Sequence, residues 1–378
     1  MTNESLEMAR QLVLQYGWNS TCFQILNPGI ERWISPKGNA VVGYVVRNDI
    51  RVVAGAPVCA LEDLEEVIRL WEEVAEEAGH GICYFGAEGR MKRCLHLKPG
   101  YSTVSMGAQP SWNPQDWSTI FDGDKSLRAQ RNRATNKGVA VSEWTCSEAT
   151  SHPDLHRCLE EWLTTRGLPP MHFLVEPETL SCLEGRRIFV AEQFGEPVGF
   201  LVLSPVPERR GWLTEQFPRG FKAPNGTVEI LMDTAIRTVG LSGSEYVTMG
   251  IIPLSRQGLS AASPNPIWLN LISGWVRAHG RRFYNFDGLD YFKLKFHPQQ
   301  WEPIYVISKE DQFSFRSLYA IAAAFSDGSP LWAVTRGLGR AVQQEYRWIK
   351  ESAKRKLHSE LPPISAVAKP RALSKGVK

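Results

Sequence analysis

Apolar residues recur at the spacing of an α-helix in several separate segments of this chain. The clearest segment is 61–74, where the apolar side chains share one face and glutamates fill the opposite face. Its apolar positions are Leu61, Leu64, Val67, Ile68, Trp71 and Val74. Similar patterns predict further helices at 4–16, 154–165, 226–239 and 268–276. Helices are therefore expected at intervals along most of the chain.

Short runs of apolar and β-branched residues between these helices are typical of strands. The predicted strands are 40–46, 50–54, 81–86, 187–193, 198–203, 211–217 and 246–252. A stretch that includes Trp112 and Trp117 is irregular. The order of helix, strand, turn and strand occurs twice, about 150 residues apart, which indicates either duplicated units or a chance likeness of pattern. This alternation predicts an α+β fold with mixed central sheets.

A Gly/Pro-rich turn joins one of these strands to the helix that begins near Asn225. Pro224 disfavours a helical residue before it, so the helix starts sharply, with Asn225 as its cap and Gly226 allowing close backbone approach. Unpaired amides and the helix dipole favour an anion or a carbonyl oxygen at such a start. Glu215 and Arg219 are expected to face it, the carboxylate acting on a nucleophile and the arginine on a phosphate or carbonyl. The alternative is an ordinary connection with a Glu215–Arg219 ion pair.

Two further segments are candidates for ligand binding. In 284–305, Lys293 and Lys295 alternate with aromatic and aliphatic residues as on a strand, so both are expected to point the same way, toward a phosphate or a stacked base. In 125–137, five cations occur without an acid, and Arg128 and Arg131 are expected on a helix stripe that grips phosphates. Solvated surface charge is the alternative for both segments.

The last part of the sequence is basic. Residues 331–354 place apolar side chains on one helical face and arginines and lysines on much of the rest, which predicts a helix lying on an anionic membrane surface or packed on the protein with its basic side in solvent. The tail 358–378 has no core pattern and is predicted to be disordered.

Composition narrows the possible classes of protein. With 378 residues, 43% of them hydrophobic, the chain has room for two or three globular domains, and a net charge of +3 permits a polyanionic partner without requiring one.

Seven scattered cysteines without a CxxC pair argue against a disulfide framework or a zinc ribbon. His152 and His156 have the spacing of a metal pair, but Pro153 intervenes and no third ligand is near, so no metal is expected. A secretory signal and long apolar runs are absent, so a cytoplasmic location is expected, with attachment at the inner face of a membrane left open.

Known catalytic loops are also missing, since the sequence has no GxSxG, Walker or post-strand GxGxxG motif. Several segments instead resemble the catalytic domain of the phosphatidylglycerol lysyltransferase family, the aminoacyl-tRNA-dependent lipid aminoacyltransferases, in particular its stand-alone bacterial members. These segments are YGWN (16–19), VVAGAPV (52–58), SLRAQRNRATNKG (126–138), EQFPRGFKAPNGTVEIL (215–231), MGIIPLS (249–255) and YNFDGLDYFKLKFHPQQWEPIY (284–305).

The resemblance implies a tandem pair of acetyltransferase-like (GNAT) domains, here 1–147 and a catalytic 148–310, followed by a helical segment 311–357. It implies transfer of an aminoacyl group from aminoacyl-tRNA to a lipid hydroxyl such as that of phosphatidylglycerol, without a metal or a nucleotide cofactor and without DNA as a partner. Glu215 and Arg219 would be the catalytic pair. The substrate-binding residues would be Asn225, Gly226, Glu229, Lys293, Lys295, Arg128 and Arg131.

Two departures from the family pattern affect this reading. The lipid synthases of the family carry Asp with Arg three residues later, whereas this sequence has Glu215 with Arg219 four residues later. They also carry a multi-span membrane domain, so the resemblance implies peripheral docking here, for which 331–354 is the candidate.

Sterols, peptides and small metabolites are alternative acceptors. The rival functions are acetyl-CoA-dependent N-acetylation, for which PRGFKAPNG lacks the RxxGxG/A loop, and an inactive module that binds RNA or a membrane.

Overall fold

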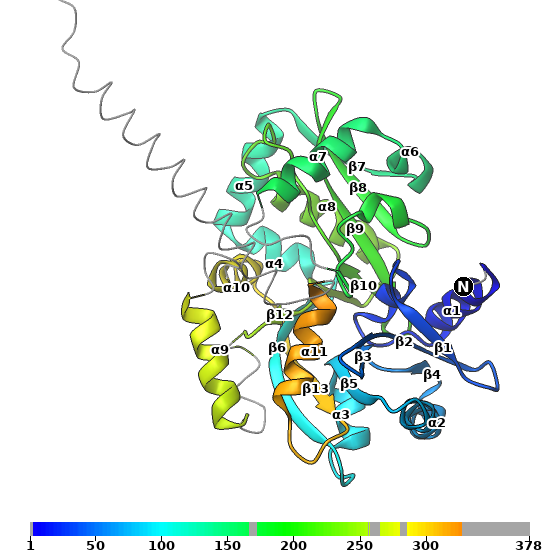
Figure 1. Ribbon diagram of the computed structural model, residues 1–378. Coiled ribbons are helices and arrows are strands. Elements are labelled where there is room, and N and C mark those ends of the chain that lie inside the picture. Colours follow the sequence, from blue (N-terminus) through cyan, green and yellow to red (C-terminus); the bar gives the residue numbers. More distant parts are fainter. Residues whose placement is uncertain (1–2, 166–171, 256, 258–264, 280–285, 327–378) are drawn as a thin grey trace, which may run out of the picture.

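The computed structural model describes residues 3–165, 172–255, 257, 265–279 and 286–326 (Figure 1). Its α-helices are α1 (Asn3–Tyr16), α2 (Leu64–Glu77), α3 (Gly89–Leu95), α4 (Trp117–Gly123), α5 (Lys125–Asn136), α6 (Cys146–Thr150), α7 (Pro153–Thr164), α8 (Thr227–Leu241), α9 (Ile267–His279), α10 (Phe286–Leu294) and α11 (Phe315–Phe325). Its strands are β1 (Glu31–Ile34), β2 (Ala40–Arg47), β3 (Ile50–Ala54), β4 (Val58–Cys59), β5 (Gly81–Ala87), β6 (Ser102–Trp112), β7 (Val139–Trp144), β8 (Arg187–Gln193), β9 (Glu196–Val206), β10 (Gly211–Thr214), β11 (Tyr246–Thr248), β12 (Ile252–Pro253) and β13 (Gln300–Ser308). Short 3-10 helices are η1 (Cys22–Leu26), η2 (Leu61–Asp63), η3 (Thr179–Cys182) and η4 (Pro207–Arg209). The predicted basic helix at 331–354 and the predicted tail at 358–378 lie outside the described residues.

The strands of the described residues form one mixed sheet. Their order is β1-β2-β3-β5-β13-β6-β11-β10-β9-β8-β7, with β12 beside β6 and β4 beside β2. The pairs β3–β5 and β10–β11 are parallel, and the other paired strands are antiparallel. The predicted α+β class with a mixed sheet is confirmed.

The two halves of the sheet repeat one arrangement. In the first half, the antiparallel pair β2–β3 is followed by α2 and then by β5, which is parallel to β3. In the second half, the antiparallel pair β9–β10 is followed by α8 and then by β11, which is parallel to β10. A parallel neighbour requires a crossover, and a helix provides it in both halves. This repeated order favours duplicated units over a chance likeness of pattern.

The strand β13 joins the sheet far from its place in the sequence. It lies between β5 and β6, pairing Ser308 with both Cys83 and Ser102. At its other end, Gln300 pairs with Ser111. Residues 300–308, which belong to the predicted second domain 148–310, therefore complete the sheet of the first half. The domain boundaries at 147/148 and 310/311 stay predictions.

Helices cover both faces of each half (Figure 1). In the first half, α1 and α11 pack on one face around Phe23 and Val45, while α2 and α3 pack on the other around Trp71 and Tyr84. In the second half, α4, α5 and α8 cover one face, and α6 and α7 cover the other. The sheet surfaces beneath these helices are therefore apolar, whereas buried polar residues such as Gln109 and Thr248 lie on the central strands, where the halves meet.

The irregular stretch around Trp112 is in fact an eleven-residue strand, β6, near the centre of the sheet. Two residues hide its pattern. Gly107 has φ 146°, and a Cβ there would lie 2.1 Å from the carbonyl oxygen of Ile252, so the position requires glycine. Pro110 cannot donate to the ladder and is unusual inside a sheet. In the sequence, a glycine and a proline at these positions indicate that a strand ends. In the structure, the neighbouring strands accommodate both residues within one continuous strand.

Candidate functional site

The turn after β10 is held against the neighbouring strand β9. The backbone amide of Glu215 donates to Val202 O, and that of Gly220 donates to Val198 O, both at 2.9 Å. Arg219 lies between these bonds and forms a bridge with Gly199. The predicted strand 211–217 is therefore regular only as far as Thr214, but its continuation is fixed in position.

The start of helix α8 departs from the prediction in one respect. Gly226, rather than Asn225, is the N-cap residue, and Asn225 is exposed. Gly226 has φ 98°, and a Cβ there would lie 2.1 Å from the carbonyl oxygen of Gln130 on α5. The predicted close backbone approach at Gly226 is thus present, and it places α5 directly against the turn.

A cavity of about 390 Å³ opens beside this turn, and we refer to it as the turn pocket. It is lined by Gln130, Arg133, Trp162, Phe217, Arg219, Asn225, Gly226, Val228, Glu229, Phe292 and Lys295. Phe217 and Phe292 are stacked, with ring centroids 5.4 Å apart. The pocket therefore combines an aromatic wall with four charged side chains.

Three of those charges are positive and one is negative. Lys295 Nζ lies 2.6 Å from Glu229 Oε1 and also 4.2 Å from the ring centroid of Phe292. Arg133 makes only a 3.4 Å contact with Gln130 among the described residues. The guanidinium of Arg219 is exposed and has no hydrogen bond or ion pair within the described part of the chain. The turn pocket thus offers two uncompensated arginines to an anion or a polarised carbonyl.

Glu215 does not face the turn pocket. Its carboxylate accepts a 2.6 Å hydrogen bond from Arg186 Nε, and both side chains are almost fully buried. Arg186 also donates to Asn27 Oδ1 at 2.7 Å, so this pair ties the second half to the first. The predicted juxtaposition of Glu215 with the helix start is therefore not seen, and neither is the alternative ion pair with Arg219.

The two lysines of 284–305 also lie differently from the prediction. Lys293 belongs to helix α10, and Lys295 follows its end, so two residues of separation turn them to different sides. Lys293 is buried and donates to Met249 O at 2.6 Å and to Gly250 O at 2.9 Å. Burial lowers the pKa of Lys293 to about 7. Only Lys295 reaches the turn pocket.

The lowered pKa of Lys293 predicts a dependence of stability on pH. The folded state binds fewer protons at Lys293 than the unfolded state between pH 7 and the usual lysine pKa of 10.5, so the free energy of unfolding should rise with pH in this window. Between pH 7.5 and 9.5, we expect the free energy of unfolding to rise by about 2 kcal/mol less in Lys293→Met than in the unmodified protein, as measured by urea unfolding. Lys37→Met, at an exposed lysine, is the matched control and should keep the full rise. An equal rise in both variants would contradict the prediction.

The basic run on α5 is mostly engaged within the protein. Arg131 contacts Asp122 and Asp233, both at 2.9 Å, and Arg128 donates to the backbone carbonyl of Asp122. These contacts compete with any phosphate for the predicted residues Arg128 and Arg131. Arg133 belongs to the predicted basic run 125–137 but was not singled out as a binding residue, although its separation of three residues from Gln130 puts both on the helix face that meets Gly226.

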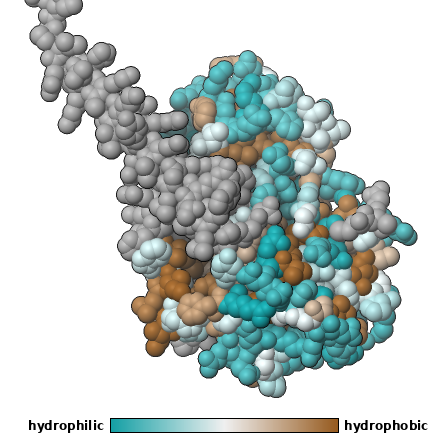
Figure 2. All heavy atoms as spheres, in the orientation of Figure 1, coloured by the Kyte–Doolittle hydropathy of each residue, from teal (hydrophilic) through white to brown (hydrophobic). Residues whose placement is uncertain are grey.

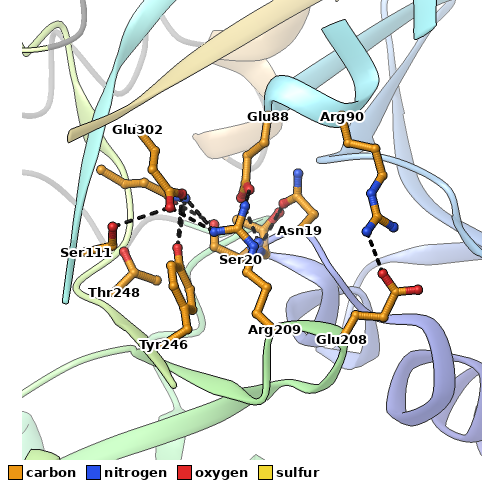
Figure 3. A network of polar contacts seen from close by, with 12 residues as sticks. Asn19, Ser20, Glu88, Arg90, Ser111, Glu208, Arg209, Tyr246, Thr248 and Glu302 are labelled. Atoms are coloured by element: carbon orange, nitrogen blue, oxygen red, sulfur yellow. Dashed lines mark hydrogen bonds and ion pairs between the residues drawn. The ribbon is translucent and has the colours of Figure 1, made fainter. Parts of the chain in front are cut away.

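A second polar cluster, also missed from the sequence, lies where the two halves meet (Figure 3). Arg209 of η4 contacts Glu88 at 2.5 Å and Glu302 of β13 at 2.9 Å. Glu88 is fully buried, and that burial raises the pKa of its carboxyl despite the nearby Arg209. Because its members come from segments far apart in sequence, no local pattern could have revealed the cluster.

The histidine pair considered for a metal makes other contacts. His156 Nε2 lies 2.7 Å from Thr150 O, and the His152 ring packs on Trp144. Within the described ranges, no group of three or more His, Cys, Asp and Glu side chains is arranged to hold a metal ion. In the same ranges, every helix is too short or too polar to cross a bilayer.

Comparison with protein families identifies the chain's relatives. A family model described as phosphatidylglycerol lysyltransferase, C-terminal, matches residues 10–308. The chain belongs to this family. The match includes the turn pocket and ends at Ser308, the last residue of β13. The resemblance noted from the sequence is thereby confirmed.

Two solved structures share the fold of this family member. The C-terminal domain of a putative lysylphosphatidylglycerol synthetase from Agrobacterium fabrum has a TM-score of 0.69 at 21% identity, covering 86% of this chain and 98% of that one. L-PGS from Bacillus licheniformis also has a TM-score of 0.69, at 20% identity, covering 84% and 95%. These two matches show that the chain has the same fold as both proteins.

Curated relatives in the family are longer proteins. A phosphatidylglycerol lysyltransferase of Staphylococcus xylosus is 22% identical over 85% of this chain and 38% of its own length. An uncharacterized protein of Corynebacterium glutamicum is 23% identical over 87% of this chain and 42% of its own length. The chain therefore spans about two fifths of the length of these relatives.

Proposed function

We propose that this protein transfers an aminoacyl group from an aminoacyl-tRNA to a lipid hydroxyl, with phosphatidylglycerol as the first acceptor to test. Family membership supports acyl transfer to a lipid, because relatives are named phosphatidylglycerol lysyltransferases. The observation that carries the proposal for this chain is the turn pocket, where uncompensated arginines meet an aromatic wall and a carboxylate. That combination suits an amphiphilic acceptor with a phosphate and an apolar body.

The chemistry requires positioning and charge stabilisation, because an aminoacyl ester is already activated. The lipid hydroxyl oxygen bonds to the ester carbonyl carbon, the bond to the ribose oxygen breaks, and the hydroxyl proton ends on that ribose oxygen. In the proposal, Glu229 takes the hydroxyl proton and Lys295 supplies one to the ribose oxygen. The proton on Glu229 then passes to Lys295, 2.6 Å away, so both groups are restored and the net transfer runs from the hydroxyl to the ribose oxygen. Arg219 stabilises the charge that develops on the carbonyl oxygen, and Arg133 holds the lipid phosphate. We assign Glu215 a structural role through Arg186.

An exposed apolar surface supports contact with lipid. Figure 2 shows apolar side chains gathered over α9, where Ile267 and Leu271 are 80% and 69% exposed. Phe315 of the adjoining α11 is exposed as well, and its ring lies 4.1 Å from that of Trp268 on α9. Aromatic and aliphatic side chains of this kind suit the interfacial region of a bilayer. We propose peripheral membrane contact through this surface, in addition to the predicted segment 331–354.

The test is a transfer assay with the purified protein, radiolabelled aminoacyl-tRNA and phosphatidylglycerol vesicles. We expect a labelled lipid that mild alkali destroys, as an aminoacyl ester requires, and we expect Glu229→Gln to lower its rate of formation by about 100-fold. Lys37→Gln, at an exposed lysine outside the pocket, is the control. Binding of tRNA or vesicles without transfer would favour the inactive module. Acetyl transfer with micromolar binding of acetyl-CoA would favour the N-acetyltransferase.

A further inference from the structure

A second cavity, of about 290 Å³, lies beside the polar cluster at the junction of the halves, and we refer to it as the junction pocket (Figure 3). It is lined by Trp18, Glu88, Gly89, Arg90, Arg93, Arg209, Glu302 and Pro303. These residues come from the segment after α1, from α3 and its start, from η4 and from β13. Neither the predicted site residues nor the proposed transfer chemistry uses this pocket.

The carboxylates of the junction pocket already have partners inside the protein. Glu88 Oε1 accepts from the Ser20 amide at 2.7 Å, and Glu88 Oε2 accepts from Arg209 Nη2 at 2.5 Å. Glu302 accepts hydrogen bonds from Arg209, Gln109, Tyr246 and Ser111. Since a carboxylate has about four lone-pair positions, Glu302 has little capacity left for a donor on a ligand.

The donors of the junction pocket are not all used. Arg90 Nη2 contacts Glu208 at 2.6 Å, and its guanidinium lies 4.3 Å from the Trp18 ring centroid, but the buried Arg90 Nη1 has no hydrogen-bond partner. Arg93 is exposed, and its guanidinium makes no hydrogen bond or ion pair to any residue that the structure describes. Buried donors without a partner are rare in folded proteins. The spare hydrogen-bonding capacity therefore suits a ligand with acceptor oxygens, that is, an anion.

The lining favours a nucleotide over a lipid as the source of this anion. Trp18 and Pro303 are the apolar side chains among the lining residues, and the Trp18 face is covered by Arg90, so acyl chains would find little apolar surface. A nucleotide instead brings hydroxyls and a planar base, which stacks well on a guanidinium plane. Arg93 of α3 lines the pocket beside Arg90, so a second guanidinium is available to a phosphate there.

We infer that the junction pocket binds a nucleotide phosphate in the single-stranded 3′ end of the RNA that donates the aminoacyl group. The identity of this RNA rests on the proposed function, whereas binding of a nucleotide phosphate does not. In this arrangement the junction pocket holds the donor RNA, and the turn pocket holds the acceptor and the reacting ester.

The experiment measures binding without transfer. Calorimetry with 5′-AMP, glycerol phosphate and phosphatidylglycerol vesicles is carried out on the full chain, on Arg93→Gln and on Arg93→Glu. Fluorescence anisotropy with a labelled single-stranded RNA ending in CCA is measured on the same three proteins. Because Arg93 is exposed and has no partner among the described residues, we expect both variants to fold, which thermal melting checks. We expect Arg93→Gln to weaken both ligands about tenfold and to lower the slope of log K against log salt for the RNA by about one, with a larger loss for Arg93→Glu. Arg69→Gln, at an exposed arginine of α2 paired with Glu73, is the matched control and should bind as the unmodified protein does.

Unchanged binding of AMP and RNA in both Arg93 variants would overturn the inference. So would a loss confined to phosphatidylglycerol vesicles or glycerol phosphate, which would assign the pocket to a lipid headgroup. If transfer fails in every assay while nucleotide binding depends on Arg93, the proposed function falls and the nucleotide site stands. If transfer succeeds and nucleotide binding ignores Arg93, the inference falls alone.

Discussion

Arg219→Ala should lower kcat/KM for aminoacyl transfer by at least about 100-fold while leaving the protein folded. The backbone on both sides of Arg219 is hydrogen-bonded to β9, so the side chain leaves the sheet at a fixed point and lines the turn pocket. A guanidinium that stabilises charge only in the transition state affects kcat and kcat/KM alike when it is removed. Because the guanidinium is exposed and unpaired within the described residues, we expect the melting temperature to change by less than about 2 °C.

Two further variants make this prediction specific. Arg219→Lys keeps the charge but loses the planar fork, so it should recover only part of the rate. Arg210→Ala removes an exposed arginine nine residues earlier, which pairs with Glu245 and does not line the turn pocket, and its rate should be unchanged. A rate for Arg219→Ala within threefold of the unmodified protein would remove Arg219 from the mechanism.

Glu215→Ala should act on stability instead. The substitution leaves Arg186 buried with its charge uncompensated, and breaking a buried ion pair in this way costs about 3–5 kcal/mol. We expect this loss in urea unfolding, and we expect activity to fall with the folded fraction. The matched control is Glu245→Ala, which breaks an exposed pair with Arg210 and should cost less than about 1 kcal/mol.

The result for Glu215→Ala also decides between the structural role and the catalytic role suggested by the sequence. If the free energy of unfolding is unchanged and kcat is lost, Glu215 acts in catalysis, and the assignment to Glu229 is wrong. Glu215→Gln adds a second comparison, because it keeps a hydrogen-bond acceptor for Arg186 Nε and should lose less stability than Glu215→Ala.

Local patterns in the sequence predicted most of the fold. The hairpin of β2 and β3 was predictable because its turn residues, Asn48 and Asp49, tolerate the positive φ angles of 51° and 56° that a tight turn requires. Helix α2 was predictable because its apolar face and its glutamates are separated cleanly. Strand β6 was missed because Gly107 and Pro110 interrupt its pattern for reasons that lie in neighbouring strands.

The candidate site was less predictable, because side-chain partners come from distant segments. The turn and Gly226 were identified from local rules, and Arg219, Glu229 and Lys295 do line the turn pocket. The sequence does not show that Arg186 takes Glu215 as its partner, or that Lys293 lies on a helix with its amine against Met249 O. An alternation of aromatic and basic residues fits a strand and a short helix equally well over so few positions.

The position of β13 has a consequence for how the chain can fold. Until residues 300–308 arrive, β5 and β6 each present a row of unpaired backbone groups, and such open edges attract other strands. The pairing of Ser308 with Cys83 spans most of the described chain, so the first half cannot complete its sheet until nearly everything after it has been synthesised. Expressed alone, the first 147 residues should therefore aggregate, whereas supplying 286–326 as a separate peptide should improve their solubility. This result would show that the two similar halves are parts of one folding unit and not separable modules.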